Sequence, residues 1–284
     1  MNTIKKIANQ IKKIEIQGAT KIALSSLEVI SDFAKKNKVN EIYKGIDLLL
    51  STRPTEPLMI NTLTSLKKIS DPVEISEHAI LFKTSIKNSM NKIVKIGSRL
   101  IEDDMIIQTI CHSSTVVNII KEAREQGKKI KVINTETRPR YQGRKTAEEL
   151  YKARVPVKMY VDSAMYLAMN KEKVNLALVG IDAIFGDGSI ANKIGTGLLS
   201  LAAEVLEVPF YASGLALKLD IGSLMAKSVK IEERDQREIW SYPIEIGNPA
   251  FEIVPPKRIK GIITELGVLS PTTAHLQIEK EYKR

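Results

Sequence analysis

The chain has 284 residues but only one cysteine, Cys111. A single cysteine excludes an intramolecular disulfide and is typical of a protein kept in a reducing cytoplasm. No apolar run reaches the roughly eighteen residues that a membrane span needs. The N-terminal residues include lysines but no apolar stretch followed by a small-residue cleavage site, which argues against secretion. We therefore expect a cytoplasmic globular protein without a membrane partner.

The sequence also lacks the common signatures of cofactor and metal sites. It contains neither a GxGxxG dinucleotide fingerprint nor a GxxxxGK[ST] phosphate loop. Its histidines, His78, His112 and His275, are far apart and have no ligand-like spacing. We predict neither a cofactor nor a bound metal.

Aromatic residues are scarce, whereas basic residues are in excess. Aromatics make up 5% of the chain, and 43 basic against 33 acidic residues give a net charge of +10. Such an excess attracts polyanions, either nucleic acids or small phosphorylated metabolites. The absence of a basic tail and the few rings available for base stacking argue against a nucleic-acid partner. A lysine-rich surface suited to solubility or heat explains the charge at least as well.

The hydrophobic pattern changes near residue 104. Before about residue 100, apolar residues recur at helical spacing, as at Ile4, Ile7 and Ile11. From Met105 to about Val268, short apolar runs alternate with helical segments, which is typical of strand–helix–strand units in a parallel sheet. We predict an α/β protein with an N-terminal α-helical domain, 1–103, and a domain with a mainly parallel sheet, 104–284.

Two residues at predicted strand ends could carry acid–base chemistry. Cys111 follows the predicted strand 105–110 and precedes a helix, whose N-terminus would lower the thiol pKa and favour the thiolate. The adjacent His112 and Ser113, with their backbone amides, could form an anion nest. Asp182 follows the apolar strand 176–179, where a carboxylate could exchange protons with a substrate. The alternatives are a buried structural cysteine and a capping aspartate.

Basic side chains at turns predict a phosphorylated ligand. Arg53, Arg138 and Lys193 lie at predicted turns, and Gln142-Gly143 would let the backbone approach a ligand. Arginine suits bidentate contacts with phosphate, while lysine acts as a point charge. Each residue alone is more often a solvated surface charge, so the prediction depends on their shared position at the ends of sheet strands.

A series of short motifs carries a resemblance to a known superfamily. They are, in order, Gly18-Ala19, Thr52-Arg53-Pro54-Thr55, Cys111-His112-Ser113, Thr135-Glu136-Thr137-Arg138-Pro139, Gln142-Gly143, Gly180-Ile181-Asp182, Asn192-Lys193-Ile194-Gly195-Thr196, Asn248-Pro249-Ala250-Phe251 and Ile263-Thr264-Glu265. The chain resembles the superfamily that unites the alpha, beta and delta subunits of translation initiation factor two-B with ribose-1,5-bisphosphate isomerase and methylthioribose-1-phosphate isomerase. The motifs extend over nearly the whole chain.

The resemblance implies a Rossmann-like second domain, a homodimer built through it, and possible hexamers as trimers of dimers. In the isomerase branch a cysteine and an aspartate interconvert an aldose phosphate and a ketose, and here they correspond to Cys111 and Asp182. Regulatory subunits commonly lack this pair. The implied substrate, a phosphorylated pentose, would be bound by Gln17, Gly18, Ala19, Arg53, His112, Ser113, Arg138, Gln142, Gly143, Asn192, Lys193 and Lys218.

Two positions depart from the isomerase pattern. Gln17 stands where isomerases typically have an arginine, and loss of that charge-assisted phosphate contact should cost about 1.5–3 kcal/mol. Ile110 stands where a histidine usually precedes the cysteine. The closing segment, 260–267, resembles archaeal proteins labelled as initiation factor subunits. Because the cysteine and aspartate of the isomerase branch are both present, we expect conversion of ribose 1,5-bisphosphate to ribulose 1,5-bisphosphate. The alternative is a non-catalytic archaeal regulatory subunit that binds initiation factor two, a nucleotide or a sugar phosphate.

Overall fold

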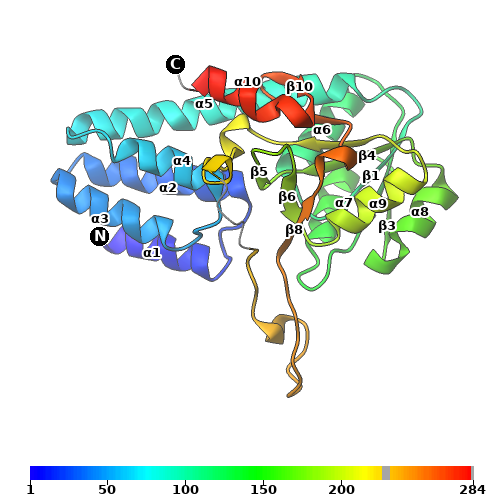
Figure 1. Cartoon of the computed structure of the whole chain (residues 1–284), viewed down its shortest axis with the longest axis horizontal. Helices are drawn as coiled ribbons and strands as arrows, with labels where there is room; N and C mark the ends of the chain where they lie inside the picture. Colours follow the sequence, from blue (N-terminus) through cyan, green and yellow to red (C-terminus); the bar gives the residue numbers. More distant parts are fainter. Residues whose placement is uncertain (226–230, 283–284) are drawn as a thin grey trace. The chain divides into compact units, whose positions relative to one another are not determined.

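The computed structural model describes residues 1–225 and 231–282 (Figure 1). The chain divides into two compact units, Met1–Ser89 with Leu217–Leu219, and Met90–Ala216 with Asp220–Arg284. The predicted change of pattern near residue 104 lies just before the first strand, while the division between the units falls inside the long helix α5 (Pro72–Arg99).

The first unit is built from amphipathic helices. They are α1 (Asn2–Lys12), α2 (Ala19–Ala34), α3 (Val39–Leu50), α4 (Pro57–Leu66) and the first part of α5. Apolar residues of each helix are buried in its core, among them Ile4, Leu27 and Ile46. Asn61 of α4 donates hydrogen bonds to the carbonyl oxygens of Leu217 and Leu219, 2.8 and 2.9 Å away. These bonds tie segment 217–219 to the helices.

The second unit contains a seven-stranded sheet. Its strands are β1 (Ile106–Thr109), β2 (Lys131–Thr135), β3 (Val157–Tyr160), β4 (Leu176–Gly180), β7 (Phe210–Ser213), β9 (Gly261–Thr264) and β10 (Gly267–Leu269). Their order is β10-β9-β7-β4-β1-β2-β3, and every neighbouring pair is parallel except β9 with β10. The predicted fold class, α/β with a mainly parallel sheet, is confirmed.

Helices connect these strands. They are α6 (Ser114–Glu125), α7 (Gln142–Lys152), α8 (Met165–Glu172), α9 (Thr196–Val205) and, after the sheet, α10 (Ala274–Tyr282). Strand β4 is buried along its whole length, as expected for a central parallel strand covered on both faces. Helix α7 begins at Gln142 with a polar first turn that shows no apolar periodicity.

The strand order reverses between β1 and β4. From β1 the chain proceeds through β2 to β3 on one side, then returns to place β4 on the other side of β1. In open parallel sheets such a reversal opens a crevice beyond the carboxyl ends of the two strands, where ligands bind. Cys111 follows β1 and Asp182 follows β4, so this topology puts both residues at the crevice position.

A small antiparallel sheet, not predicted from the sequence, extends the second unit. It contains β5 (Ala183–Ile184), β6 (Ile190–Lys193) and β8 (Phe251–Val254) in that order. Sequence reasoning missed it because two of its strands are very short or end in polar residues, and β8 is remote in sequence from β6. Its importance is that Asn192 and Lys193 lie on β6 rather than in a turn.

We expect Gly143→Ala to destabilise the protein. A Cβ at Gly143 would overlap the carbonyl oxygen of Thr135, which is backbone at the end of β2 and cannot rotate away. Alanine in a helix gains about 1 kcal/mol over glycine, but overpacking of this kind costs about 1–3 kcal/mol or more. The net loss in unfolding free energy can be measured by urea denaturation.

Gly247→Ala is the matched control. Gly247 has no neighbour near its missing Cβ, so the free energy of unfolding should stay within about 0.5 kcal/mol of the wild type. Equal stability of the two variants would contradict the packing inferred for Gly143.

Candidate active site

Cys111 occupies an unusual backbone position two residues after the end of β1. Its φ is +61°, in the left-handed region that residues other than glycine seldom adopt. Its N–H donates to Oγ1 of Thr137 at 2.9 Å, and its carbonyl oxygen accepts from Oγ1 of Thr146 at 2.7 Å. Ser113 then caps α6 by accepting a hydrogen bond from the backbone N–H of Val116. The thiol-bearing residue is thus fixed on both sides.

Burial controls the protonation of the thiol. It raises the pKa of Cys111 to about 11, because an ion surrounded by protein loses its hydration. The cation of Lys193 and a backbone hydrogen bond from His112 lower this pKa, while the carboxylates of Asp182 and Asp162 raise it further. The prediction that a helix N-terminus would favour the thiolate is therefore wrong, since desolvation outweighs the favourable contributions.

Asp182 lies within electrostatic range of Cys111, on the neighbouring strand end. Its carboxylate contributes to the raised pKa of the thiol, and its backbone N–H donates to the carbonyl oxygen of Ala191 at 2.9 Å. The loops after β1 and β4 are closely packed, because a Cβ at Gly180 would lie 2.7 Å from Oγ of Ser113. The structure therefore brings the two predicted acid–base residues to the same edge of the sheet.

Lys193 and Asn192 reach this edge from β6. The ammonium of Lys193 lies 4.7 Å from the ring centroid of Phe251, on the paired strand β8. Asn192 is buried, and its side chain donates to Oγ1 of Thr196 at 3.0 Å. Its side-chain oxygen, Oδ1, would lie 3.7 Å from a Cβ at Gly180, so Asn192 of β6 packs against the end of β4.

Arg138 is held after β2. Its backbone N–H donates to Asp162 at 2.7 Å, and its guanidinium donates to the hydroxyl of Tyr141 at 2.6 Å. The guanidinium also lies 5.1 Å from the Tyr141 ring centroid. This exposed cation is preorganised beside Gln142, the first residue of α7. Gly143 is buried against Thr135 and has a packing role.

His112 is half-buried beside the thiol loop. Its Nδ1 lies 3.2 Å from Oγ1 of Thr146, and its Nε2 lies 3.7 Å from a carboxylate oxygen of Glu149. Burial lowers the pKa of His112, with Lys145 and Lys121 acting in the same direction and Glu149 opposing them. The imidazole is therefore neutral at physiological pH.

The remaining predicted site residues belong to the first unit. Gln17 and Gly18 are exposed, and Ala19 is buried at the start of α2. Arg53 is half-buried between α3 and α4, and Lys218 is only 5% exposed. These five residues therefore belong to one unit, while Cys111 and Asp182 belong to the other.

Sequence reasoning missed two residues of the second unit. Asp162 lies two residues after the end of β3, and the rule that selected Asp182 at a strand end could have selected it too. Its carboxylate accepts backbone hydrogen bonds from Thr137 and Arg138. Thr146 lies inside α7, and its role depends on a contact with Cys111 that no local pattern reveals.

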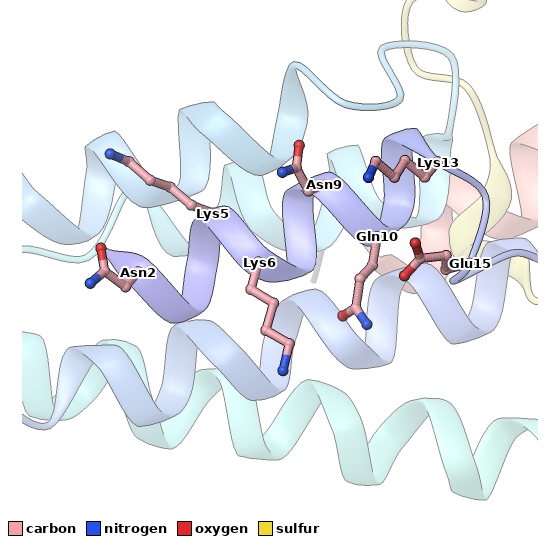
Figure 2. A pocket seen from close by; sticks show the side chains of 7 residues that line it. All are labelled: Asn2, Lys5, Lys6, Asn9, Gln10, Lys13 and Glu15. Atoms are coloured by element: carbon pink, nitrogen blue, oxygen red, sulfur yellow. The ribbon is translucent and has the colours of Figure 1, made fainter.

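An open depression on α1 is lined by exposed polar side chains (Figure 2). Its residues are Asn2, Lys5, Lys6, Asn9, Gln10, Lys13 and Glu15. Figure 2 shows Lys5 and Lys6 extending from α1 in different directions, as on a solvated helix face. We do not include it in the candidate site.

Within residues 1–225 and 231–282, no group of three or more His, Cys, Asp or Glu side chains is arranged to hold a metal ion. None of the helices in those ranges combines the length and the apolar character that crossing a bilayer requires.

The helical unit, the parallel sheet and the cysteine and aspartate at its reversal point define an α/β protein with a candidate ligand site at the carboxyl edge. Comparison with known proteins gives the family. The chain belongs to the Initiation factor 2 subunit family, whose pattern matches residues 15–271. The resemblance seen in the sequence motifs is confirmed.

Named relatives include enzymes and translation factors. The chain is 34% identical to ribose 1,5-bisphosphate isomerase of Archaeoglobus fulgidus, over 98% of this chain and 93% of the relative. Among solved structures it is similar to translation initiation factor eIF-2B of Pyrococcus horikoshii OT3, with a TM-score of 0.86, 29% identity and coverage of 94% and 97% of the two chains. It is also similar to 5-methylthioribose 1-phosphate isomerase of the same organism, with a TM-score of 0.82, 26% identity and coverage of 98% and 88%.

We expect substitutions of Lys193 and Asp182 to move the reactivity of the thiol in opposite directions. Lys193→Gln removes a cation that lowers the pKa of Cys111, so the pKa should rise above about 11 and alkylation by iodoacetamide at pH 9 should slow. Asp182→Asn removes an anion that raises this pKa, so alkylation should accelerate. The expected changes are about two- to tenfold.

Because Cys111 is the only cysteine, the alkylation rate reports on this thiol alone. Lys152→Gln, which removes a surface cation paired with Glu148, is the control and should leave the rate unchanged. Shifts of the same sign in the first two variants would contradict the electrostatic arrangement.

Proposed function

We propose that the protein is a sugar-phosphate aldose–ketose isomerase that converts ribose 1,5-bisphosphate into ribulose 1,5-bisphosphate. The observation that carries this proposal is the placement of Cys111 and Asp182 after the adjacent parallel strands β1 and β4, with Lys193 on β6 close enough for its charge to act on the thiol. The relative from Archaeoglobus fulgidus, named for this activity, supports it over nearly the full length of both chains. An enzyme with one free thiol would suit a reducing cytoplasm.

The reaction needs two proton transfers and no external reactant. The C2–H bond of the furanose breaks and a C–H bond forms at C1, while the bond from C1 to the ring oxygen breaks. The proton of the C2 hydroxyl then ends on the former ring oxygen, so the composition is unchanged. One acid–base group must serve the carbons and another the oxygens.

We assign the carbon-bound proton to Cys111 and the oxygen-bound protons to Asp182. With a pKa of about 11 the free thiol is protonated at neutral pH, so its thiolate is scarce but strongly basic. A strong base suits removal of a weakly acidic C–H proton, provided that a nearby cation stabilises the thiolate. Lys193, which lowers the thiol pKa, is placed for that task.

The phosphates require cations, and the chain supplies several candidates. In the second unit these are Lys193 and Arg138, the latter oriented by Tyr141 and Asp162. Arg53 and Gln17 belong to the first unit, and their contacts with a phosphate stay predictions from the family resemblance, in which the neutral Gln17 would bind more weakly than an arginine. The loss of about 1.5–3 kcal/mol should then appear as weaker substrate binding rather than slower proton transfer.

We expect Cys111→Ser and Asp182→Asn each to lower kcat by about 10²–10⁴-fold, the usual contribution of a positioned acid–base group. Formation of ribulose 1,5-bisphosphate from ribose 1,5-bisphosphate by the purified protein is the measurement. Gln277→Ala, on the exposed face of α10, is the control and should retain wild-type kcat.

The similarity to a translation initiation factor motivates a second candidate, a non-catalytic subunit that binds initiation factor two. A pull-down with purified initiation factor two distinguishes the two functions. Retention of the factor, together with no turnover by the wild type on ribose 1,5-bisphosphate or methylthioribose 1-phosphate, would reject the isomerase.

We also propose that two copies of the chain associate through α8 and α9. Tyr166 and Leu167 of α8, and Leu198, Leu201 and Val205 of α9, are large apolar side chains that are 42–60% exposed. The two helices pack against each other, so these exposed residues lie on neighbouring elements and could together cover one interface. Patches of this kind on folded proteins commonly mark protein–protein interfaces.

Leu201→Asp should convert the oligomer to monomers, because it places a charge within the apolar patch. Light scattering coupled to size-exclusion chromatography measures the mass and separates a dimer from a trimer of dimers. Leu276→Asp, at an exposed leucine of α10, is the matched control and should keep the wild-type mass. An unchanged mass for Leu201→Asp would exclude this face as the interface.

A further inference from the structure

We propose that Thr137 and Thr146 are positioning residues that clamp Cys111 in its left-handed backbone conformation and so aim its thiol for proton transfer. This inference rests on the proposed role of Cys111 and names two residues on which that role depends. Thr137 lies after β2, and Thr146 lies on α7, so the clamp joins three separate segments of the second unit.

The conformation of Cys111 needs external support. Both Cys111 and Thr137 have positive φ, +61° and +63°, which is rare for a residue with a Cβ and rarer for a β-branched one. Such conformations cost of order 1–3 kcal/mol each and persist only where the surroundings fix them. Cys111 and Thr137 are in direct contact, so two adjacent backbone conformations that are unfavourable in isolation must be stabilised by the surrounding structure.

The two threonine hydroxyls satisfy both backbone groups of Cys111. Thr137 Oγ1 accepts from its N–H at 2.9 Å, and Thr146 Oγ1 donates to its carbonyl oxygen at 2.7 Å. Because both threonines are buried, these bonds compete little with water. Neither bond belongs to a helix or a sheet ladder, so the backbone angle of Cys111 depends on the two side chains.

Asp162 fixes the first threonine in turn. Its two carboxylate oxygens accept the N–H groups of Thr137 and Arg138, at 2.8 and 2.7 Å. Charge-assisted bonds of this kind are stronger than neutral ones. The carboxylate at the end of β3 therefore supports the turn that holds Thr137 against Cys111.

His112 fixes the second threonine. The Thr146 hydroxyl has one hydrogen, which it donates to the Cys111 carbonyl oxygen, so the 3.2 Å contact with His112 Nδ1 requires the histidine to donate. In this arrangement the neutral imidazole carries its proton on Nδ1, and a change of the Thr146 side-chain rotamer would lose both contacts.

The test compares Thr137→Val and Thr146→Val, which remove a hydroxyl at nearly constant volume, with Thr137→Ser and Thr146→Ser, which keep it. The first readout is the pH dependence of alkylation of the single cysteine, which needs no substrate. The second is the separate measurement of kcat and KM on ribose 1,5-bisphosphate. Thr62→Val is the control, because Thr62 is equally buried and its hydroxyl donates to a backbone carbonyl within α4.

In the valine variants the Cys111 backbone should relax and expose the thiol. Its pKa should then fall from about 11 toward the ordinary value, and alkylation at pH 8 should accelerate about tenfold or more. Displacement of the thiol should lower kcat by about ten- to a hundredfold, with KM within about threefold of the wild type. The serine variants should restore both readouts, and Thr62→Val should change neither.

Valine variants that keep the wild-type alkylation profile and lose no more kcat than Thr62→Val would overturn the clamp. Failure of the serine variants to restore the slower wild-type alkylation and the wild-type kcat would do the same. If one valine variant does not fold, the other one and the two serine variants decide the outcome. Absence of turnover in the wild type would refute the proposed isomerase but leave the alkylation comparison intact.

Discussion

The reversal of strand order between β1 and β4 is the constraint on which the candidate site depends. Because the two strands are parallel neighbours, paired at Ile107 with Leu176 and Gln108 with Ala177, their carboxyl ends lie at one edge of the sheet. Residues remote in sequence, Cys111 and Asp182, therefore follow adjacent strands without any specific contact having to draw them together. The topology alone places the two residues at neighbouring strand ends, and their side chains determine the chemistry that this position allows.

Burial then decides what chemistry the thiol can perform. Protein around Cys111 disfavours its charged form more than Lys193 and the nearby backbone hydrogen bond favour it. The cation reaches the thiol from β6, in the antiparallel sheet that follows Asp182 in the chain. A thiolate that burial makes unfavourable, but that a nearby ammonium stabilises, is better suited to brief proton transfer than to acting as a permanently charged nucleophile.

The fold was largely predictable from the sequence, and the site only partly. Apolar runs such as Leu176–Val179 are long enough to predict parallel strands, and their ends located Cys111 and Asp182. The pair β5 and β6 carries too few residues for a periodic signal, so the place of Lys193 was missed. The sign of the Cys111 pKa shift was also wrong, because it depends on how much protein surrounds the thiol, a quantity that no local pattern contains.

The glycines and the departure at Ile110 illustrate the same limit. Gly143 was interpreted as backbone freed to approach a ligand, yet its missing side chain makes room for the Thr135 carbonyl.

Ile110 is 2% exposed, and a Cβ at Gly195 would lie 2.7 Å from its Cδ1 and 3.1 Å from Cε of Met165. Its side chain therefore packs against the starts of α8 and α9. An isoleucine in that apolar setting needs no hydrogen-bond partner, whereas a histidine there would need one. Isoleucine in place of histidine at position 110 thus changes the packing just before Cys111. The residues Cys111, Asp182 and Lys193 themselves are present.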